Sequence, residues 1–135
     1  MNDMTKVLIP TDFSETSLMQ LESFIQNNQE KQFEYVLMFS EHLDDSITEL
    51  LFYSPSKFLE NKMPKSFKLA FEQLTEKYKQ NCKINLLPFH GFTTSAFENF
   101  IEGNSITNYY FPQNLQYKIG FNPSKFINKS KLKAI

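Results

Sequence analysis

Arginine is absent from this 135-residue sequence, in which all 14 cationic side chains are lysines. A guanidinium group binds phosphate bidentately, so proteins that hold phosphate through side chains usually contain arginine, although lysine and backbone amides can also do so. The net charge is −1, and the basic residues are scattered except for Lys125, Lys129, Lys131 and Lys133. We interpret that cluster as a solvated helix end. Nucleic-acid binding needs a clustered cationic face, so we expect no nucleic-acid partner.

Cysteine is nearly absent as well, because Cys82 is the single one. One thiol excludes an internal disulfide and a cysteine-based metal cage. No apolar run approaches the roughly 20 residues that a membrane span requires. Residues 1–6 lack the basic-then-apolar order of a signal peptide. The expected location is therefore the cytoplasm, with no membrane partner.

Catalytic motifs are also missing. The sequence has no Gly-x-Ser-x-Gly elbow and no P-loop. Its two histidines, His42 and His90, lack the neighbouring carboxylate pairs of a metal site or a catalytic triad. Asp44 and Asp45 lack the further oxygen ligands of an EF-hand-like loop, so we interpret them as solvated. The sequence thus predicts no catalytic residues and no metal site, which argues against an enzyme.

Apolar residues, in contrast, are plentiful. They make up 41% of the sequence, and 15 of the residues are phenylalanine. A chain of this length and composition fits one domain, residues 1–135, built around one core.

Short apolar runs alternate with segments of helical periodicity along the chain. Strands are expected at residues 7–9, 34–39, 84–89 and 106–111. Helices are expected at residues 14–26, 46–51, 64–81 and 94–103, and from residue 123 onward. The first helix is capped by Asp12 or Ser14, and the fourth by Thr94 or Ser95. Strand-helix repeats without hairpin signals predict a parallel, helix-covered sheet, and no convincing fifth strand is visible.

Two connecting segments carry local signals. Pro88 cannot donate to a strand ladder, so the third strand is expected at a sheet edge. Ser54-Pro55-Ser56 is expected to end the short helix that precedes it. Leu51, Phe52 and Tyr53 are unusually apolar for a connection. They either pack on the rim of the sheet, which we favour, or form a self-association surface.

The predicted winding places a ligand crevice at the carboxyl ends of the strands. If the first strand is central, the winding reverses between it and the fourth strand, and open α/β sheets bind ligands at that point. Asp12 is the best site candidate, as a ligand contact or as an N-cap that also satisfies backbone at the strand end. The crevice is expected to be lined by Thr11, Asp12, Phe39, Ser40, Pro112 and Gln113.

The opening segment Lys6-Val7-Leu8-Ile9-Pro10-Thr11-Asp12-Phe13-Ser14-Glu15-Thr16-Ser17 resembles the start of the universal stress protein family. The polar loop at Ser40-Glu41-His42 and Gly91 after the third strand are similar too. The resemblance is specific over about the first 25 residues and architectural beyond them. It implies a three-layer Rossmann-like sandwich (adenine nucleotide alpha hydrolase-like) with a mainly parallel sheet of four to five strands. It also implies a homodimer, often paired through a fifth strand, and roles in stress survival and signalling rather than catalysis.

Many members of this family bind ATP. The resemblance assigns the ribose or phosphate contact to Asp12, and the adenine contact to backbone near Phe39 and Ser40. Family members that bind ATP have a glycine pair after the fourth strand, then a Gly-Ser or Gly-Thr at a helix start. Here the sequence after Phe111 offers Gly120 alone. Glycines let backbone approach phosphate closely, so we expect no tight ATP binding and no other cofactor.

These observations leave several functional hypotheses, of which the first is preferred. It is a non-catalytic, universal-stress-protein-like module with a degenerate nucleotide site, which acts through contacts with a protein partner that the sequence does not identify. The second is a regulatory domain that binds ATP, another nucleotide or a small anion through Asp12. The third is a nucleotide-hydrolysing enzyme of related fold. A phospho-receiver domain is rejected, because Thr11-Asp12 and Phe89-His90 stand where it would need its acidic residues.

Overall fold

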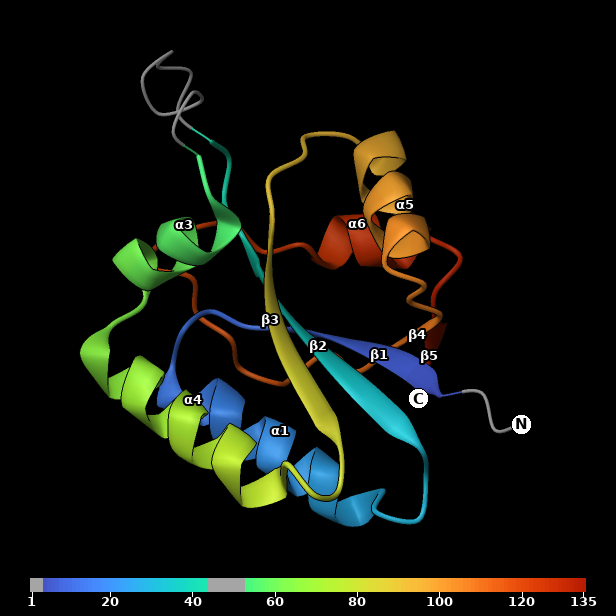
Figure 1. Ribbon diagram of the computed structural model, residues 1–135. Helices are drawn as coiled ribbons and strands as arrows, with labels where there is room; N and C mark the ends of the chain where they lie inside the picture. Colours follow the sequence, from blue (N-terminus) through green and yellow to red (C-terminus); the bar gives the residue numbers. More distant parts are fainter. Residues whose placement is uncertain (1–3, 44–52) are drawn as a thin grey trace.

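The computed structural model describes residues 4–43 and 53–135. The strands form one all-parallel sheet in the order β3-β2-β1-β4-β5 (Figure 1). The strands are β1 Thr5–Pro10, β2 Phe33–Ser40, β3 Lys83–Phe89, β4 Asn108–Tyr109 and β5 Lys133–Ala134. The helices are α1 Glu15–Asn27, α3 Pro55–Lys62, α4 Lys65–Tyr78, α5 Thr94–Gly103 and α6 Ser124–Lys129.

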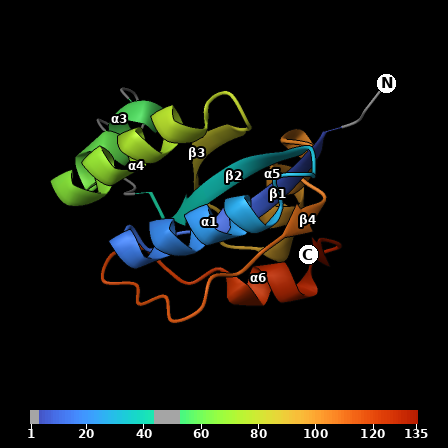
Figure 2. The ribbon, with the colours of Figure 1, turned by 90° about the horizontal axis from the view of Figure 1, so that it is seen from below.

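The helices cover both faces of the sheet (Figure 2). Helices α1, α3 and α4 pack on one face, and α5 and α6 pack on the other. The predicted three-layer α/β sandwich with a parallel sheet is thereby confirmed.

Strand β1 lies at the centre of the sheet and contributes side chains to the cores on both of its faces. Val7 and Ile9 point into the core beneath α1 and α4, whereas Leu8 points into the core beneath α5 and α6. All three side chains are fully buried. Alternate residues of a strand face opposite sides, so a strand covered on both sides is apolar throughout. This explains the continuous apolar run that opens the sequence.

Helix caps resolve the choices that the sequence left open. Ser14 caps α1, because its Oγ accepts the backbone N–H of Ser17 at 3.1 Å. In α5 the cap is Thr93, whose Oγ1 accepts the N–H of Ala96 at 3.0 Å. The prediction of Thr94 or Ser95 was therefore wrong, since three consecutive hydroxyl residues satisfy the same sequence rule.

The segment Ser54-Pro55-Ser56, expected as a helix break, begins a helix. Ser54 is the N-cap of α3, and Pro55 occupies the first turn. Proline has no N–H to lose there, and its φ already suits a helix. The predicted preceding helix at residues 46–51, with Leu51 and Phe52, lies outside the described residues.

A fifth strand is present, although the sequence shows no convincing apolar run for it. The N–H of Lys133 donates to Thr107 O at 3.1 Å, and the N–H of Ile135 donates to Tyr109 O at 3.0 Å. Strand β5 has only two residues, and both are exposed, so no apolar pattern marks it in the sequence. Its partner β4 is also shorter than the predicted run of residues 106–111.

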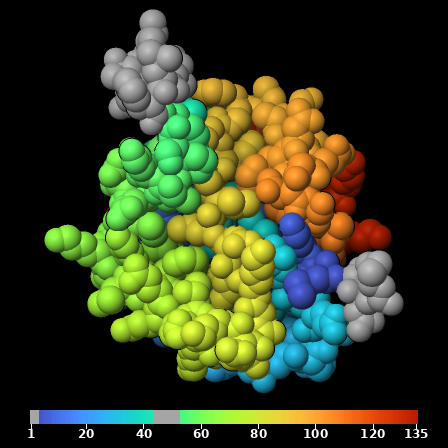
Figure 3. Space-filling model, viewed as in Figure 1, coloured from blue at the N-terminus to red at the C-terminus, as the bar shows by residue number. Residues whose placement is uncertain are grey.

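Strand β3 forms an edge of the sheet, as Pro88 predicted. The carbonyl of Phe89 accepts the N–H of Glu41 at 3.0 Å, so the backbone of Phe89 faces the neighbouring chain segment. Backbone groups alternate in direction along a strand, which turns the nitrogen of Pro88 outward, where no ladder bond is needed. Figure 3 shows this strand, in yellow, at the surface between the green and orange helices.

Helices α1 and α4 are amphipathic and lie side by side on the sheet. In α4, Phe67, Leu74 and Tyr78 are buried, whereas Glu72 and Glu76 are exposed. Across residues 4–43 and 53–135, no helix is long and apolar enough to cross a membrane. The apolar stripes pack on the sheet instead.

The core predicts a contrast between two leucines on neighbouring helices. Leu21 on α1 is fully buried, whereas Leu69 on α4 is 59% exposed. Leu21→Ala should lower the free energy of unfolding by about 2–5 kcal/mol, because it leaves a cavity. Leu69→Ala, the matched control, should change it by about 0.5 kcal/mol or less. Urea denaturation measures both, and equal losses would contradict this assignment of the core.

Candidate functional site

The predicted crevice lies at the carboxyl ends of β1 and β2, beside the segment that follows β4. Strand β1 stands between β2 and β4, so the winding reverses between β1 and β4 as expected. The six predicted residues all lie at this edge, and most of them are buried. Thr11, Phe39 and Ser40 are fully buried, and Asp12 is 8% exposed. Pro112 is also buried, and Gln113 is exposed.

Both carboxylate oxygens of Asp12 accept hydrogen bonds from the chain itself. Oδ1 accepts the N–H of Ser14 at 3.0 Å and its hydroxyl at 2.5 Å. Oδ2 accepts the N–H of Gln116 at 2.7 Å. The carboxylate therefore connects the start of α1 to the segment between β4 and α6. Asp12 is not the N-cap of α1, which is Ser14, but it holds Ser14 through two hydrogen bonds.

A second polar network lies beneath Asp12. Thr11 Oγ1 accepts the N–H of Phe13 at 3.0 Å and lies 2.8 Å from Ser17 Oγ. Ser17 Oγ donates to the carbonyl of Ser14 at 2.7 Å, so its proton is committed and Thr11 is the donor to Ser17. These hydroxyls hold the turn between β1 and α1 in shape.

This turn places an aromatic ring over the end of β2. Phe13 has a φ of +64°, which is uncommon for a residue with a bulky side chain. Its ring stacks on Phe39 at a centroid distance of 4.0 Å and also contacts Phe67 at 4.9 Å. Burial of the ring offsets the cost of the strained backbone. The apolar wall of the crevice is thus covered by the protein's own side chain.

Residues 113–121, which we call the covering segment, extend across the same edge of the sheet. The backbone N–H of Gln113 donates to Gln20 Oε1 at 2.6 Å, and Gln20 Nε2 donates to the carbonyl of Gln113 at 2.7 Å. At the other end, the N–H of Phe121 donates to the carbonyl of Ser40 at 2.8 Å. The covering segment therefore occupies the position in which the sequence predicted a ligand.

Gly120 is required for this close approach. Its φ is +74°, and an added Cβ would lie 2.3 Å from the carbonyl oxygen of Ser40 and 2.8 Å from the ring of Phe39. Any side chain would force the covering segment away from β2. Sequence reasoning noted Gly120 only as an isolated glycine, because nothing in the sequence indicates which surface the loop contacts.

Two hydroxyls are buried at this edge without a hydrogen-bond partner among the described residues, Ser40 Oγ and Tyr117 Oη. Burial raises the pKa of Tyr117, and the negative charge of Asp12 raises it further. The phenol therefore stays protonated. Buried polar atoms normally have partners, so this pair of hydroxyls is a conspicuous feature of the site.

His90 belongs to a separate polar cluster at the end of β3. Its Nδ1 lies 2.6 Å from the carbonyl oxygen of Glu41, and its Nε2 lies 2.5 Å from the hydroxyl of Tyr53. A carbonyl only accepts, so Nδ1 carries the proton and Nε2 accepts from Tyr53. Glu41 directs its carboxylate to Lys62 instead, at 3.0 Å. The cluster thus ties α3 to the sheet and shows no nucleophile–base–acid arrangement among these residues.

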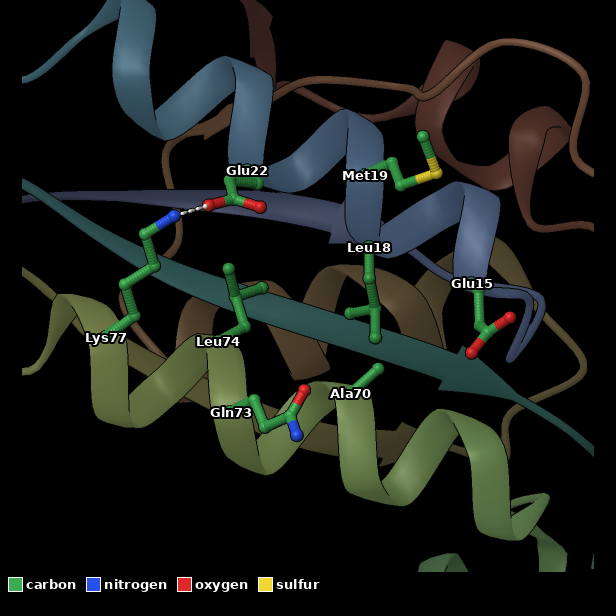
Figure 4. A pocket seen from close by; sticks show the side chains of 8 residues that line it. All are labelled: Glu15, Leu18, Met19, Glu22, Ala70, Gln73, Leu74 and Lys77. Carbon is green, nitrogen blue, oxygen red and sulfur yellow. Dashed lines mark hydrogen bonds and ion pairs between the residues drawn. The ribbon is translucent and has the colours of Figure 1, made fainter.

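A groove of about 410 Å³ separates α1 from α4 (Figure 4). An ion pair between Lys77 and Glu22, at 2.8 Å, crosses one end of it. The lining residues are Glu15, Leu18, Met19, Glu22, Ala70, Gln73, Leu74 and Lys77. None of the six predicted site residues is among them. Within residues 4–43 and 53–135, no three His, Cys, Asp or Glu side chains gather closely enough to hold a metal ion.

By sequence, no protein-family model and no curated protein matches the chain. Solved structures do match. The universal stress protein UspA from Lactobacillus plantarum aligns with a TM-score of 0.57 and 14% identity, over 99% of this chain and 98% of that one. A universal stress protein family member from Burkholderia pseudomallei aligns with a TM-score of 0.52 and 10% identity, over 97% and 93% of the two chains. A universal stress protein in complex with cAMP aligns with a TM-score of 0.52 and 14% identity, over 97% and 94%.

These matches confirm the fold to which the opening segment pointed. The chain has the universal stress protein fold over nearly its whole length, and its structural neighbours are universal stress proteins. At such low identity the similarity establishes the fold alone, since one fold hosts many functions.

The His90 cluster predicts a pH dependence of stability. Burial lowers the pKa of His90, so the unfolded chain binds this proton more readily than the folded protein does. This contribution to stability is complete above about pH 6.5, the ordinary pKa of histidine, and is lost as the pH falls below it. The stability difference between the wild type and His90→Gln should therefore shrink from pH 8 to pH 5.5 in urea denaturation. The exposed His42→Gln serves as the control, and a constant difference for His90→Gln would contradict the prediction.

Proposed function

We propose that this protein is a non-catalytic, universal-stress-protein-like module of stress response or signalling, which acts through protein contacts and does not hold ATP tightly. One observation carries the proposal. The acceptors at the expected nucleotide crevice, Asp12 Oδ2 and the carbonyl of Ser40, already receive backbone N–H groups from the covering segment.

The chemistry of the edge supports a weak or absent interaction with triphosphate. Phosphate sites direct several N–H groups outward at the anion. Here the N–H groups of Gln116 and Phe121 point inward at the protein's own oxygens. The carboxylate of Asp12 adds a negative charge that repels phosphate.

The hydroxyls of Thr11, Ser14 and Ser17 support a non-catalytic role. Each is engaged in the turn that precedes α1, so each holds backbone in place rather than serving as a nucleophile. A nucleotide-hydrolysing enzyme would need a nucleophile or a positioned base at this edge. Asp12, the one carboxylate of the predicted crevice, is committed to Ser14 and Gln116.

We also propose a cytoplasmic homodimer that contacts a further protein. The resemblance implies pairing through a fifth strand, and β5 supplies such a strand at the sheet edge opposite β3. An exposed strand edge presents backbone groups that can pair with another chain.

A nucleotide-binding regulatory domain that uses Asp12 is the second candidate. Asp12 lies at the reversal of the winding, where α/β sheets bind ligands. One neighbour of the same fold is described in complex with cAMP. Such a ligand would have to displace the covering segment from Asp12 before it could bind there.

Thermal denaturation with and without millimolar ATP and Mg²⁺ tests the proposal. A ligand at 100 times its Kd would add about 2.7 kcal/mol to the folded state and raise the melting temperature clearly. We expect no upward shift for the wild type. A clear shift that disappears in Asp12→Asn would overturn the proposal in favour of the second candidate.

The structure predicts that Asp12 matters for stability without any ligand. Asp12→Ala removes the acceptor of three donor groups, the N–H and Oγ of Ser14 and the N–H of Gln116. The free energy of unfolding should fall by about 2–4 kcal/mol in urea denaturation. Glu15→Ala, at the exposed neighbouring helix position, is the control and should cost about 0.5 kcal/mol. An unchanged stability for Asp12→Ala would show that these hydrogen bonds do not stabilise the fold.

A further inference from the structure

The outer side of the edge strand β3 carries backbone groups that have no ladder partner among residues 4–43 and 53–135. Phe89 directs its backbone toward β2, because its carbonyl accepts the N–H of Glu41. Backbone direction alternates along a strand, so Ile84, Leu86 and Pro88 direct theirs outward. Proline has no N–H. The outer side therefore offers the carbonyl groups of all three residues and the N–H groups of Ile84 and Leu86.

This edge is apolar and has little of the protection usual for an exposed strand. Ile84 and Leu86 are half-buried against the core beneath α1 and α4, and Leu87 is half-buried against the core on the opposite face. Exposed edges are usually protected by charges, prolines, bulges or a very short length. In β3 the charge is at the first residue, Lys83, and the proline is near the last. The middle of the strand is open to another strand (Figure 3).

Pro88 favours one antiparallel register for two copies of β3. In an antiparallel pair, hydrogen-bonded residues that lie opposite each other exchange two N–H···O bonds. A two-fold axis at Asn85 sets Ile84 of each copy opposite Leu86 of the other. Every outward N–H of both strands is then bonded, and Pro88 lies beyond the ladder. An axis at Leu86 would instead set Pro88 opposite Ile84, whose carbonyl would then face a proline ring with no N–H.

A shift of the axis in the other direction, to Ile84, is also unfavourable. It would set Leu86 opposite Cys82, which precedes β3. The N–H of Cys82 already donates to the carbonyl of Tyr78 at 3.0 Å, so this pair could not exchange both bonds. The backbone therefore favours the axis at Asn85.

The side chains of β3 also fit an axis at Asn85. Ile84 of each copy lies beside Leu86 of the other, so the apolar side chains form a continuous strip across the axis. On the opposite face, the two Asn85 side chains lie beside each other. Asn85 Nδ2 donates to Glu34 Oε2 at 3.2 Å. An amide has a second N–H and a carbonyl oxygen, so the two amides can also bond to each other.

We propose that a second copy of this chain pairs with β3 in antiparallel orientation, about a two-fold axis at Asn85, and joins the two sheets into one. The interface consists of the backbone bonds between Ile84 and Leu86 of the two copies and of the apolar strip. This inference deepens the homodimer of the proposed function, on which it rests, by adding a pairing edge other than β5.

Sedimentation equilibrium tests this interface in a background in which β5 cannot pair. The N–H groups of Lys133 and Ile135 face β4, so Ala134 directs its N–H outward, and Ala134→Pro removes that donor alone. We expect the Ala134→Pro variant to be a dimer. Adding Leu86→Pro should raise the dimer Kd at least about tenfold, because each copy loses an interchain hydrogen bond. Pro88 shows that β3 tolerates proline at an outward position, and circular dichroism checks that both variants fold.

The outcomes separate the two pairing edges. A monomeric Ala134→Pro variant beside a dimeric wild type would overturn the inference and leave pairing through β5, so the two proposals fail separately. A double variant that dimerises as tightly as Ala134→Pro alone would overturn it too. A wild type that stays monomeric would overturn both and leave the edge to a different partner.

Disulfide cross-linking tests the register and remains informative if the Leu86→Pro variant does not fold. In the proposed pair the Asn85 Cα atoms lie about 4.5 Å apart, within the range of a disulfide. Asn85→Cys, combined with Cys82→Ala, should therefore give a covalent dimer on oxidation with glutathione disulfide. Lys83→Cys in the same background is the matched control, because its Cα atoms would lie about 14 Å apart. Equal yields, or no covalent dimer from Asn85→Cys, would overturn the proposal.

Discussion

The carboxylate of Asp12 is the interaction on which the geometry of the site depends. At 8% exposure it is a nearly buried charge, and a buried charge needs donors on its oxygens. Ser14 and the backbone of Gln116 supply them, so one side chain positions both the start of α1 and a segment from the far end of the chain. Both oxygens therefore hold parts of the chain itself, and the carboxylate joins two segments that are about 100 residues apart in the sequence.

Aromatic packing beside this carboxylate also helps to fill the expected ligand crevice. Phe13 has a strained φ of +64°, and its ring stacks on Phe39 and contacts Phe67. Gly120 then passes so close to Phe39 and Ser40 that no Cβ would fit. The ring of Phe13, at the turn after β1, and the missing side chain of Gly120, in the covering segment, are complementary in shape. Together they fill a space that the winding of the sheet would otherwise leave for a ligand.

The sequence predicted the features that depend on long apolar patterns and on proline. The central position of β1, the edge position of β3 and the reversal beside Asp12 all follow from runs of side chains and from Pro88. The sequence did not predict the features that depend on backbone hydrogen bonds. Strand β5 consists of two exposed residues, and Ser54 starts a helix in a context that equally suits a break. The covering segment was missed for the same reason, since its contacts are backbone N–H groups that any residue except proline offers.

The same distinction separates fold from function in this protein. Its fold is that of universal stress proteins at 10–14% identity, because the continuous apolar runs of a buried parallel sheet tolerate extensive replacement of one apolar side chain by another. A binding site has no such tolerance, since it depends on which donor meets which acceptor. In this chain the donors that meet Asp12 and Ser40 are its own. At this edge the hydrogen bonds are made within the chain, and the fold alone does not determine that arrangement.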